Sequence, residues 1–275
     1  MNRPASPSIL LLDDSPLVAR AVEAWLTENS TTIPALSGSQ VYPVETVAGL
    51  EAELSDPDMV VDLVVVDPVL HPGQPGGLKG IALTARLRPE IPIVMYSAME
   101  NNGDRFMYVL AAATWFAGSR LSALIPKVFH VGETAVGFRV SEAIAQVIAG
   151  THVDPLLTQL RAPDIRDQFA RLLHPSDLAS WRAVMRQPKQ SDAAALVGKR
   201  ATTFRDWERE KLDALSYLWE RLNVTPVGGQ PGMYDNDAQA GSTHLLLRQF
   251  AYQQSAFFAD PFLDEWAGSE SVAAP

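Results

Sequence analysis

The sequence predicts an α/β doubly wound domain followed by an all-α domain, and two patterns carry this prediction. In the first 150 residues, short apolar runs alternate with stretches in which apolar residues recur every three to four positions. This alternation is typical of a parallel sheet with helices on both faces, because strands that are buried on both sides read as continuous apolar runs. Beyond residue 163 the helical periodicity continues and strand-like runs do not return.

Five strands and five helices are expected in the first half. The strands lie within residues 8–15, 41–46, 61–67, 91–98 and 123–129, and the helices within residues 16–29, 47–54, 80–88, 105–118 and 140–150. The third strand contains three consecutive β-branched valines, which favour strands. The first helix begins at Pro16, a residue that suits the first helical position. In such a sheet the ligand crevice lies at the carboxyl ends of the strands.

Changes in composition divide the chain into segments. Residues 1–150 are expected to form the α/β domain, and residues 151–163 a linker that contains two prolines. Residues 164–224 hold the helical domain, with helices expected over 164–173, 175–187, 191–198 and 202–222. Residues 225–275 begin as a connector rich in Gly, Pro, Asn and Asp. They end in an amphipathic stretch, 243–266, that is expected to be a helix packed on the body of the protein.

Charge and cysteine content narrow the class of protein. The 275 residues carry a formal charge of -10 and no cysteine, which excludes disulfides and thiolate metal sites and suits a reducing compartment. The charge is uneven, because residues 151–224 hold 12 Lys and Arg against 10 Asp and Glu, whereas residues 1–150 hold 9 against 16. No apolar run is long enough for a membrane span or a secretory leader. A cytoplasmic protein without a membrane partner is expected.

Polar residues follow four of the expected strands. Asp13 and Asp14 follow the first strand, Asp67 the third, Ser97 the fourth and Lys127 the fifth. All five should face one crevice. Three carboxylates placed together resist joint ionisation unless a cation offsets their charge, and such hard oxygen ligands suit Mg²⁺. A metal beside a carboxylate and a lysine also suits phosphoryl transfer.

The motifs ILLLDDSPLVARAVEAWL, DLVVVD, PIVMYSA and LIPK resemble the receiver domains of two-component response regulators, over about half of the chain. The resemblance implies a flavodoxin-like fold with a five-stranded parallel sheet. It implies that Asp67 accepts a phosphoryl group from a histidine kinase, that Ser97 is the switch hydroxyl, and that Lys127 pairs with the phosphoryl group. It also implies that Mg²⁺ is held by Asp13, Asp14, Asp67 and the backbone carbonyl of Val69.

Two features depart from the receiver pattern. The loop after Asp67 carries Pro68, His71 and Pro72 with extra glycines, so it is longer and stiffer than the short loop of the family. Leu124 stands three residues before Lys127, where the family usually has an aromatic switch residue. A receiver that is switched by a ligand or a partner instead of phosphate therefore stays open. For the Asp13-Asp14 pair, a simple cap of the following helix is the structural alternative.

Residues 191–212 predict a helix-turn-helix. Small Ala193 and Ala194 allow close helix crossing, and Gly198 permits a sharp turn before a second helix that begins at Thr202 or Thr203. The candidate DNA contacts in the turn and the second helix are Lys199, Arg200, Thr203, Arg205 and Arg209. The layout loosely resembles the four-helix output domains of LuxR/NarL-type regulators. The alternative is that the apolar face of residues 204–222 packs or forms a dimer seam.

Together these features predict a response regulator that regulates transcription by binding double-stranded DNA, as a homodimer on a two-fold operator. A signalling adaptor that recruits a protein and binds no DNA is the alternative from another class. The sequence holds no Gly-rich phosphate loop, nucleophile elbow or histidine-based triad, and its five histidines lack metal-ligand spacing. An enzyme with turnover on an external substrate is therefore not expected.

Overall fold

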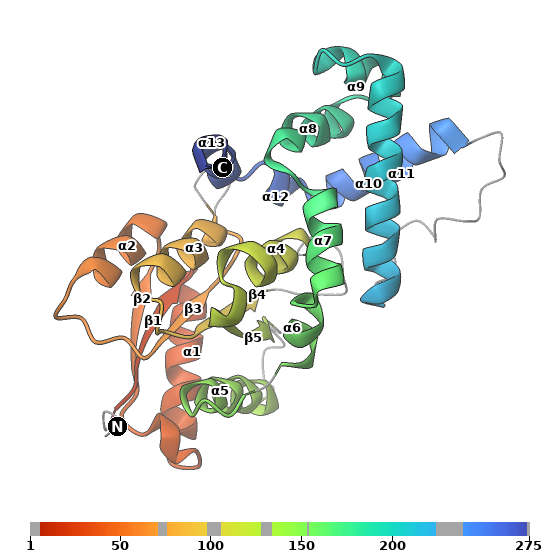
Figure 1. Cartoon of the computed structure of the whole chain (residues 1–275). Coiled ribbons are helices and arrows are strands. Elements are labelled where there is room, and N and C mark those ends of the chain that lie inside the picture. Colours follow the sequence, from red (N-terminus) through yellow and green to blue (C-terminus); the bar gives the residue numbers. More distant parts are fainter. Residues whose placement is uncertain are drawn as a thin grey trace. The chain divides into compact units, whose positions relative to one another are not determined.

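The computed structural model describes residues 6–70, 76–97, 106–127, 134–152, 154–223 and 239–273 (Figure 1). The chain forms two compact units. The first comprises Met1–Met99 and Ala111–Thr158, and the second comprises Glu100–Leu110 and Gln159–Pro275. Among the described residues, no helix combines the length and the hydropathy needed to cross a membrane.

The first unit is built on a five-stranded parallel sheet. Its strands are β1 (Ser8–Leu12), β2 (Gln40–Val44), β3 (Leu63–Val66), β4 (Ile93–Ser97) and β5 (Leu121–Pro126), in the order β2-β1-β3-β4-β5. This order confirms the flavodoxin-like, doubly wound prediction. Every residue of β3 and β4 is buried, which explains why these strands read as unbroken apolar runs. The strand order reverses between β1 and β3, so the crevice lies at their carboxyl ends.

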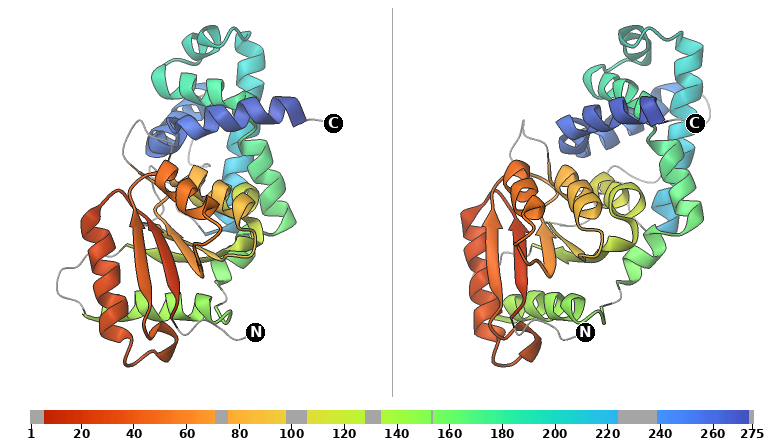
Figure 2. Two further views of the ribbon diagram at one scale, coloured as in Figure 1. Left: turned by 90° about the vertical axis from the view of Figure 1, so that its left-hand side faces the viewer. Right: turned by 60° about the vertical axis from the view of Figure 1, so that its left-hand side comes forward.

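Helices cover both faces of the sheet. Figure 2 shows α1 (Pro16–Asn29) and α5 (Thr134–Ile148) on one side, and α2 (Val47–Ser55) and α3 (Gly77–Leu87) on the other. Val22 and Leu26 of α1 and Ile144 of α5 share one apolar core with alternate residues of the central strands. Successive side chains of a strand point to opposite faces of the sheet. The same alternation sets the face to which the residues that follow each strand point.

Three local features differ from the expected elements. The helix expected over 105–118 is α4 (Phe106–Ala111), which continues as a π-helix at Ala112–Phe116. The last helix of the α/β unit begins at Thr134, before the expected start at residue 140. The linker expected over 151–163 contains a helix, α6 (Pro155–Leu160). Asp154 supports α6, because its Oδ1 accepts the N–H groups of Leu156 and Leu157 at 2.9 and 3.3 Å.

Among its described residues the second unit contains helices and turns but no strand, as expected. Besides residues 106–110 of α4 and the 3-10 helix at Pro175–Asp177, its helices are α7 (Pro163–Leu172), α8 (Leu178–Arg186), α9 (Gln190–Leu196), α10 (Ala201–Arg221), α11 (Gln239–Gln253), α12 (Ser255–Phe258) and α13 (Pro261–Ala273). The single helix expected over 243–266 is therefore wrong. The helix is interrupted after Gln253 and again before Pro261. Proline cannot continue a preceding helix but suits the first position of a new one. The expected connector falls largely on residues 224–238, outside the described residues.

Aromatic side chains form the core of the second unit. The Trp181 ring stacks on Phe258 at 5.1 Å and contacts Trp207 at 5.4 Å and Phe250 at 5.6 Å between ring centroids. Phe250 and Phe258 come from α11 and α12, so the C-terminal segment completes this core. It is not an independent appendage.

Candidate functional site

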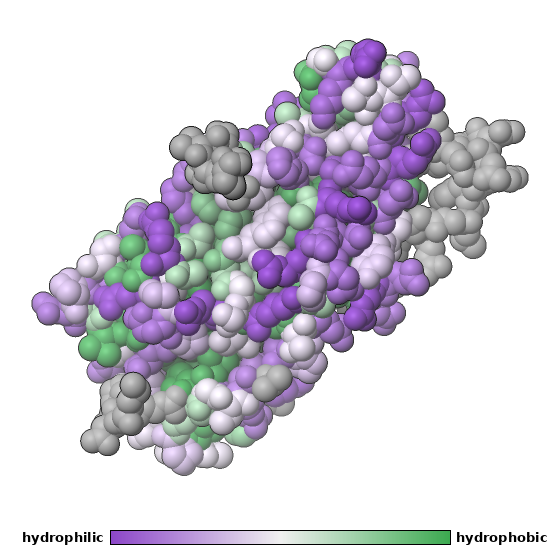
Figure 3. Space-filling view, in the orientation of Figure 1, coloured by the Kyte–Doolittle hydropathy of each residue, from purple (hydrophilic) through white to green (hydrophobic). Residues whose placement is uncertain are grey.

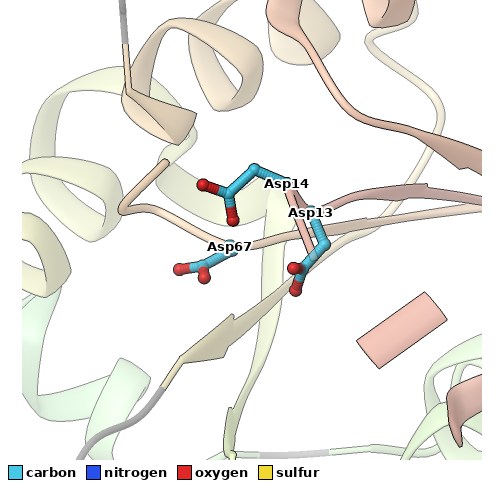
Figure 4. Close-up of side chains that lie close together, drawn as sticks. All are labelled: Asp13, Asp14 and Asp67. Atoms are coloured by element: carbon cyan, nitrogen blue, oxygen red, sulfur yellow. The ribbon is translucent and has the colours of Figure 1, made fainter. Parts of the chain in front are cut away.

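Three carboxylates meet at the carboxyl ends of β1 and β3 (Figure 4). Asp13, Asp14 and Asp67 each offer a carboxylate oxygen, and these three atoms lie within 4.8 Å of one another. Backbone hydrogen bonds fix the positions, because the Asp13 N–H donates to Val44 O at 3.1 Å and the Asp67 N–H to Leu12 O at 2.9 Å. The sheet itself therefore holds the acids together.

Lys127 closes the acidic cluster. Its Nζ lies 2.5 Å from Asp13 Oδ2 and 2.5 Å from Asp67 Oδ2, and all three side chains are buried. The Lys127 N–H donates to the Ser97 carbonyl at 2.6 Å, which ties the lysine to the end of β4. Among the described residues, Asp13 and Asp67 share this ammonium. Carboxylates placed as close together as these three repel one another, which favours a bound cation.

The second oxygens of the two buried acids bind backbone. Asp67 Oδ1 accepts the N–H of Val69 at 3.0 Å, and Asp13 Oδ1 accepts the N–H of Ser15 at 2.9 Å. Asp13 thus makes a local turn before α1 and also enters the cluster. It does not cap α1, because the N-cap residue is Ser15 and no side chain of the described residues makes a cap hydrogen bond there. Burial raises the pKa of Asp67, against the lowering effect of Lys127 and of the Val69 N–H, and Asp13 raises it further.

Ser97 supplies an unpartnered hydroxyl at the same edge. Its Oγ is fully buried and has no hydrogen-bond partner among the described residues. A buried hydroxyl without a partner is unfavourable, so this atom is suited to bind a group that enters the crevice. Hard carboxylate donors and a free hydroxyl fit a divalent cation such as Mg²⁺ together with an oxygen-rich anion.

Two residues of the site were missed by the sequence analysis. The ring of Tyr96 lies 5.4 Å from Lys127 Nζ, and burial, followed by the charges of Asp13 and Asp67, strongly raises the pKa of its hydroxyl. Strand alternation could have found it, since Tyr96 shares a face with Lys127. Gly77, the first residue of α3, is the other, and its N–H donates to the Pro68 carbonyl at 3.0 Å. The rest of the loop, residues 71–75, lies outside the described residues.

The predicted helix-turn-helix corresponds to α9, a turn and α10. Gly198 adopts φ +66°, and the N–H groups of Gly198 and Lys199 donate to Ala195 O and Ala194 O at 3.1 and 2.9 Å. This pattern is a Schellman motif, which ends α9 and redirects the chain. The helix α10 begins at Ala201, one residue before the earlier of the two expected starts, Thr202 and Thr203.

The candidate DNA contacts divide into two groups. Arg200, the N-cap of α10, is exposed, as are Thr203, Arg205 and Arg209 in the first turns of this helix. Lys199 is half-buried instead, with its Nζ donating to Ser180 Oγ at 3.0 Å. It also lies over the Trp207 ring, so it contributes to packing. In the view of Figure 3 the surface over the second unit is mainly hydrophilic.

The apolar face of α10 packs inside the second unit. Its buried residues include Phe204, Trp207, Leu215, Leu218 and Trp219. Trp219 contacts Phe250 of α11 at 6.1 Å between ring centroids. Leu212 and Leu222 are only half-buried. The heptad-like pattern is therefore explained largely by packing within one chain.

Solved structures with the same general architecture include response regulators. RcsB from Salmonella enterica serovar Typhimurium, bound to a promoter in the presence of phosphomimetic BeF3, aligns with 88% of this chain and 98% of its own at 16% identity and a TM-score of 0.48. The phosphorylated cyanobacterial phytochrome response regulator RcpA aligns with 55% and 99% at 19% identity and a TM-score of 0.39. No family model and no curated protein matches the chain. TM-scores below 0.5 assign no function, which is therefore argued from the residues of the chain.

Proposed function

We propose that this chain is a response regulator that accepts a phosphoryl group on Asp67 and regulates transcription through its helical unit. One observation carries the proposal. Asp13, Asp14 and Asp67 converge at the switch point of a parallel sheet, and Lys127 bridges two of them at 2.5 Å. A plain helix cap requires neither the third acid nor the buried lysine.

Phosphoryl transfer at this site needs no redox partner. A carboxylate oxygen of Asp67 forms a bond to phosphorus while the bond from phosphorus to the donor breaks, and the donor leaves with that electron pair. Bound Mg²⁺ would offset the charge on the phosphoryl oxygens. Asp13, Asp14, Asp67 and the Val69 carbonyl would hold it. Lys127 and the Ser97 hydroxyl are placed to bind phosphoryl oxygens, and a histidine kinase is the expected donor.

Incubation with a small phosphodonor and Mg²⁺, followed by intact-mass measurement, tests the acceptor. The wild-type chain should gain one phosphoryl group, and Asp67→Ala should gain none. Asp58→Ala, at an exposed aspartate on the same unit, is the matched control and should react like wild type. Phosphorylation that survives in Asp67→Ala would refute the assignment. A wild-type chain that is never phosphorylated would favour a receiver switched by a ligand or partner.

The exposed arginines of α10 support DNA binding as the output. Arg205 and Arg209 lie one turn apart and can reach phosphates or base edges. Binding to duplex DNA should weaken steeply with salt, because each phosphate contact releases counterions. The double variant Arg205→Ala/Arg209→Ala should lose most of its affinity, whereas Arg166→Ala, an exposed arginine on α7, should change it little.

One observation favours the adaptor alternative. Asp206 lies between the two arginines and its Oδ1 is 4.0 Å from Arg209 Nη1, while exposed Glu210 and Asp213 follow on the same helix. These acids reduce the positive potential of the surface. If the wild-type chain shows no duplex binding at low salt, before or after phosphorylation, the helical unit is a protein-binding module and the DNA proposal is wrong.

A further inference from the structure

Lys127 has an aromatic partner in addition to its two carboxylates. Its Nζ lies over the ring of Tyr96, 5.4 Å from the ring centroid. Tyr96 belongs to β4, is almost fully buried, and shares the core between the sheet, α1 and α5. Lys127 is buried as well. The contact therefore lies in a desolvated region, where the attraction between an ammonium and a ring face is largest.

The Tyr96 ring can fix the position of the Lys127 ammonium in the acidic site. A lysine side chain is a flexible four-carbon stem with a point charge at its end, and the carboxylates alone fix only that end. Asp13 and Asp67 also compete for the same ammonium, at 2.5 Å each. A ring beneath the ammonium supplies a third, non-carboxylate contact that persists when a carboxylate changes its charge or its ligand. This is the situation at Asp67 once it carries a phosphoryl group.

We propose that Tyr96 is a positioning residue for phosphoryl transfer, whose ring holds the Lys127 ammonium between Asp13 and Asp67. The inference rests on the proposed function of Asp67. It adds a residue outside the motif residues assigned to the site, at a position fixed by strand geometry. Tyr96 and Ser97 are consecutive in β4, so the same backbone directs the ring to one face of the sheet and the hydroxyl to the other.

Graded fluorination of the ring tests this role. Tyr96→Phe keeps the ring and should retain the rate of Asp67 phosphorylation within about twofold, since the attraction belongs to the ring face. Replacing residue 96 by mono-, di- and trifluorophenylalanine withdraws charge from that face with little change of size. The rate should fall stepwise, by roughly tenfold over the series. Equal rates across the series would overturn the proposal, because a purely structural role depends on size.

A second readout does not depend on phosphorylation. In the unphosphorylated wild-type chain, the ε-methylene protons of Lys127 should be shifted upfield in the NMR spectrum by the ring current of Tyr96. They should retain this shift in Tyr96→Phe and lose it progressively along the fluorinated series. An unshifted Lys127 in wild type would refute the positioning of the ammonium. If the Lys127 proton resonances are shifted upfield but the chain takes no phosphoryl group, the positioning of the ammonium is supported and the phosphoacceptor proposal is wrong.

Discussion

At the scale of single residues, Gly77 shows how closely the backbone approaches the acidic site. A Cβ at this position would lie 1.8 Å from the carbonyl oxygen of Asp67 and 2.7 Å from the Cα of Pro68. Both neighbours are backbone atoms and cannot rotate away. Any side chain at position 77 must therefore displace either α3 or the residue that we propose as the phosphoacceptor.

Gly77→Ala is expected to lower the free energy of unfolding by about 2 kcal/mol, in the range of overpacking substitutions. It should also slow phosphorylation of Asp67, because the strain falls on the Asp67 backbone. Urea unfolding and the intact-mass assay measure the two effects. Gly268→Ala is the matched control: a Cβ there meets nothing within 4 Å, so the helix α13 should be unaffected or slightly more stable. Equal urea midpoints for the two variants would contradict the close approach.

A second residue-scale feature is the buried pair of Glu208 and His244, which joins α10 to α11. His244 Nδ1 lies 2.6 Å from Glu208 Oε1, and Nε2 donates to the carbonyl of Gln187 at 2.9 Å. Glu208 is fully buried. Burial lowers the pKa of His244, but the hydrogen bonds to Glu208 and Gln187 and the charge of Glu208 outweigh it, and the pKa is raised above 6.5.

The raised pKa of His244 determines how this pair contributes to stability at different pH values. A histidine whose pKa is higher in the folded than in the unfolded chain contributes stability that is fully present below the unfolded pKa. That contribution is lost as the pH rises through the folded pKa. The free energy of unfolding should therefore fall as the pH rises above about 6.5, the ordinary histidine value. Urea titrations from pH 6 to pH 9 measure it.

The variant His244→Gln should remove this part of the pH dependence. It should also destabilise the chain by roughly 3 kcal/mol at pH 6, because removing one partner of a buried pair is costly. His152→Gln, at a position outside this network, serves as the control. If His244→Gln and wild type lose stability in parallel with rising pH, another group is responsible.

At the scale of elements, the helix after β4 is held by the C-terminal helices. The N–H of Met107 in α4 donates to Gln254 Oε1 at 3.0 Å, and the Tyr108 ring packs edge-on against Phe257 at 5.3 Å. Met107, Tyr108 and Gln254 are buried. The chain that follows the proposed switch hydroxyl thus enters the second compact unit before it returns to the sheet at β5.

Gln254→Ala should leave the Met107 N–H buried without this acceptor, at a cost of about 1–3 kcal/mol. Hydrogen exchange of residues 106–110 should accelerate in the variant, and the unfolding free energy should drop by a similar amount. Gln249→Ala, an exposed glutamine on α11, is the control and should leave both unchanged. Unchanged protection of Met107 in Gln254→Ala would show that this bond does not hold α4.

Elements with a local signal could be predicted from the sequence. The five strands and the first helices were found because strand burial and helical periodicity are encoded in consecutive residues. The helix α6 was missed although Asp154 and Pro155 form a cap and a first-turn proline, because its six residues give little periodicity. The π-helix at Ala112–Phe116 has no signature in the sequence.

The acidic cluster could be predicted because strand ends in a parallel sheet share an edge. That reasoning places Asp13, Asp67 and Lys127 together without any knowledge of side-chain packing. Tyr96 was not found although strand alternation gives the face that its side chain occupies. Gly77 could not be found, since its role depends on how closely α3 approaches β3, which is a matter of tertiary packing.

At the scale of the whole molecule, the acidic C-terminal segment is also a core element. Residues 225–275 hold 6 Asp and Glu against 1 Lys or Arg, and their amphipathic stretch was expected to pack on the body of the protein. The structure buries apolar side chains of this segment against the helices of the second unit. They are Leu246, Leu247, Phe250, Ala251, Phe257, Phe258 and Leu263. Bidentate hydrogen bonds from Arg182 to Asp264, at 2.7 and 3.1 Å, add a polar contact to α13.

A chain that ends at Asn223 should therefore lose the fixed packing of the second unit. Each large apolar side chain contributes about 1.5–3 kcal/mol when buried, so the loss of Leu247, Phe250, Phe258 and Leu263 is on the order of 10 kcal/mol. That equals the stability of a typical domain, about 5–15 kcal/mol. Near-UV circular dichroism should show the loss of the ordered Trp181 environment, and a hydrophobic dye should bind to the exposed core.

The full-length variant Phe250→Leu separates a local packing defect from loss of the segment. It keeps most of the buried volume, so it should retain the near-UV signal and unfold cooperatively at a lower urea concentration. Leu245→Ala, at a side chain of α11 that is 51% exposed, should unfold like wild type. If the chain ending at Asn223 kept the near-UV signal and the dye stayed unbound, residues 164–223 would be a self-sufficient domain. The C-terminal helices would then only cover a core that is stable without them.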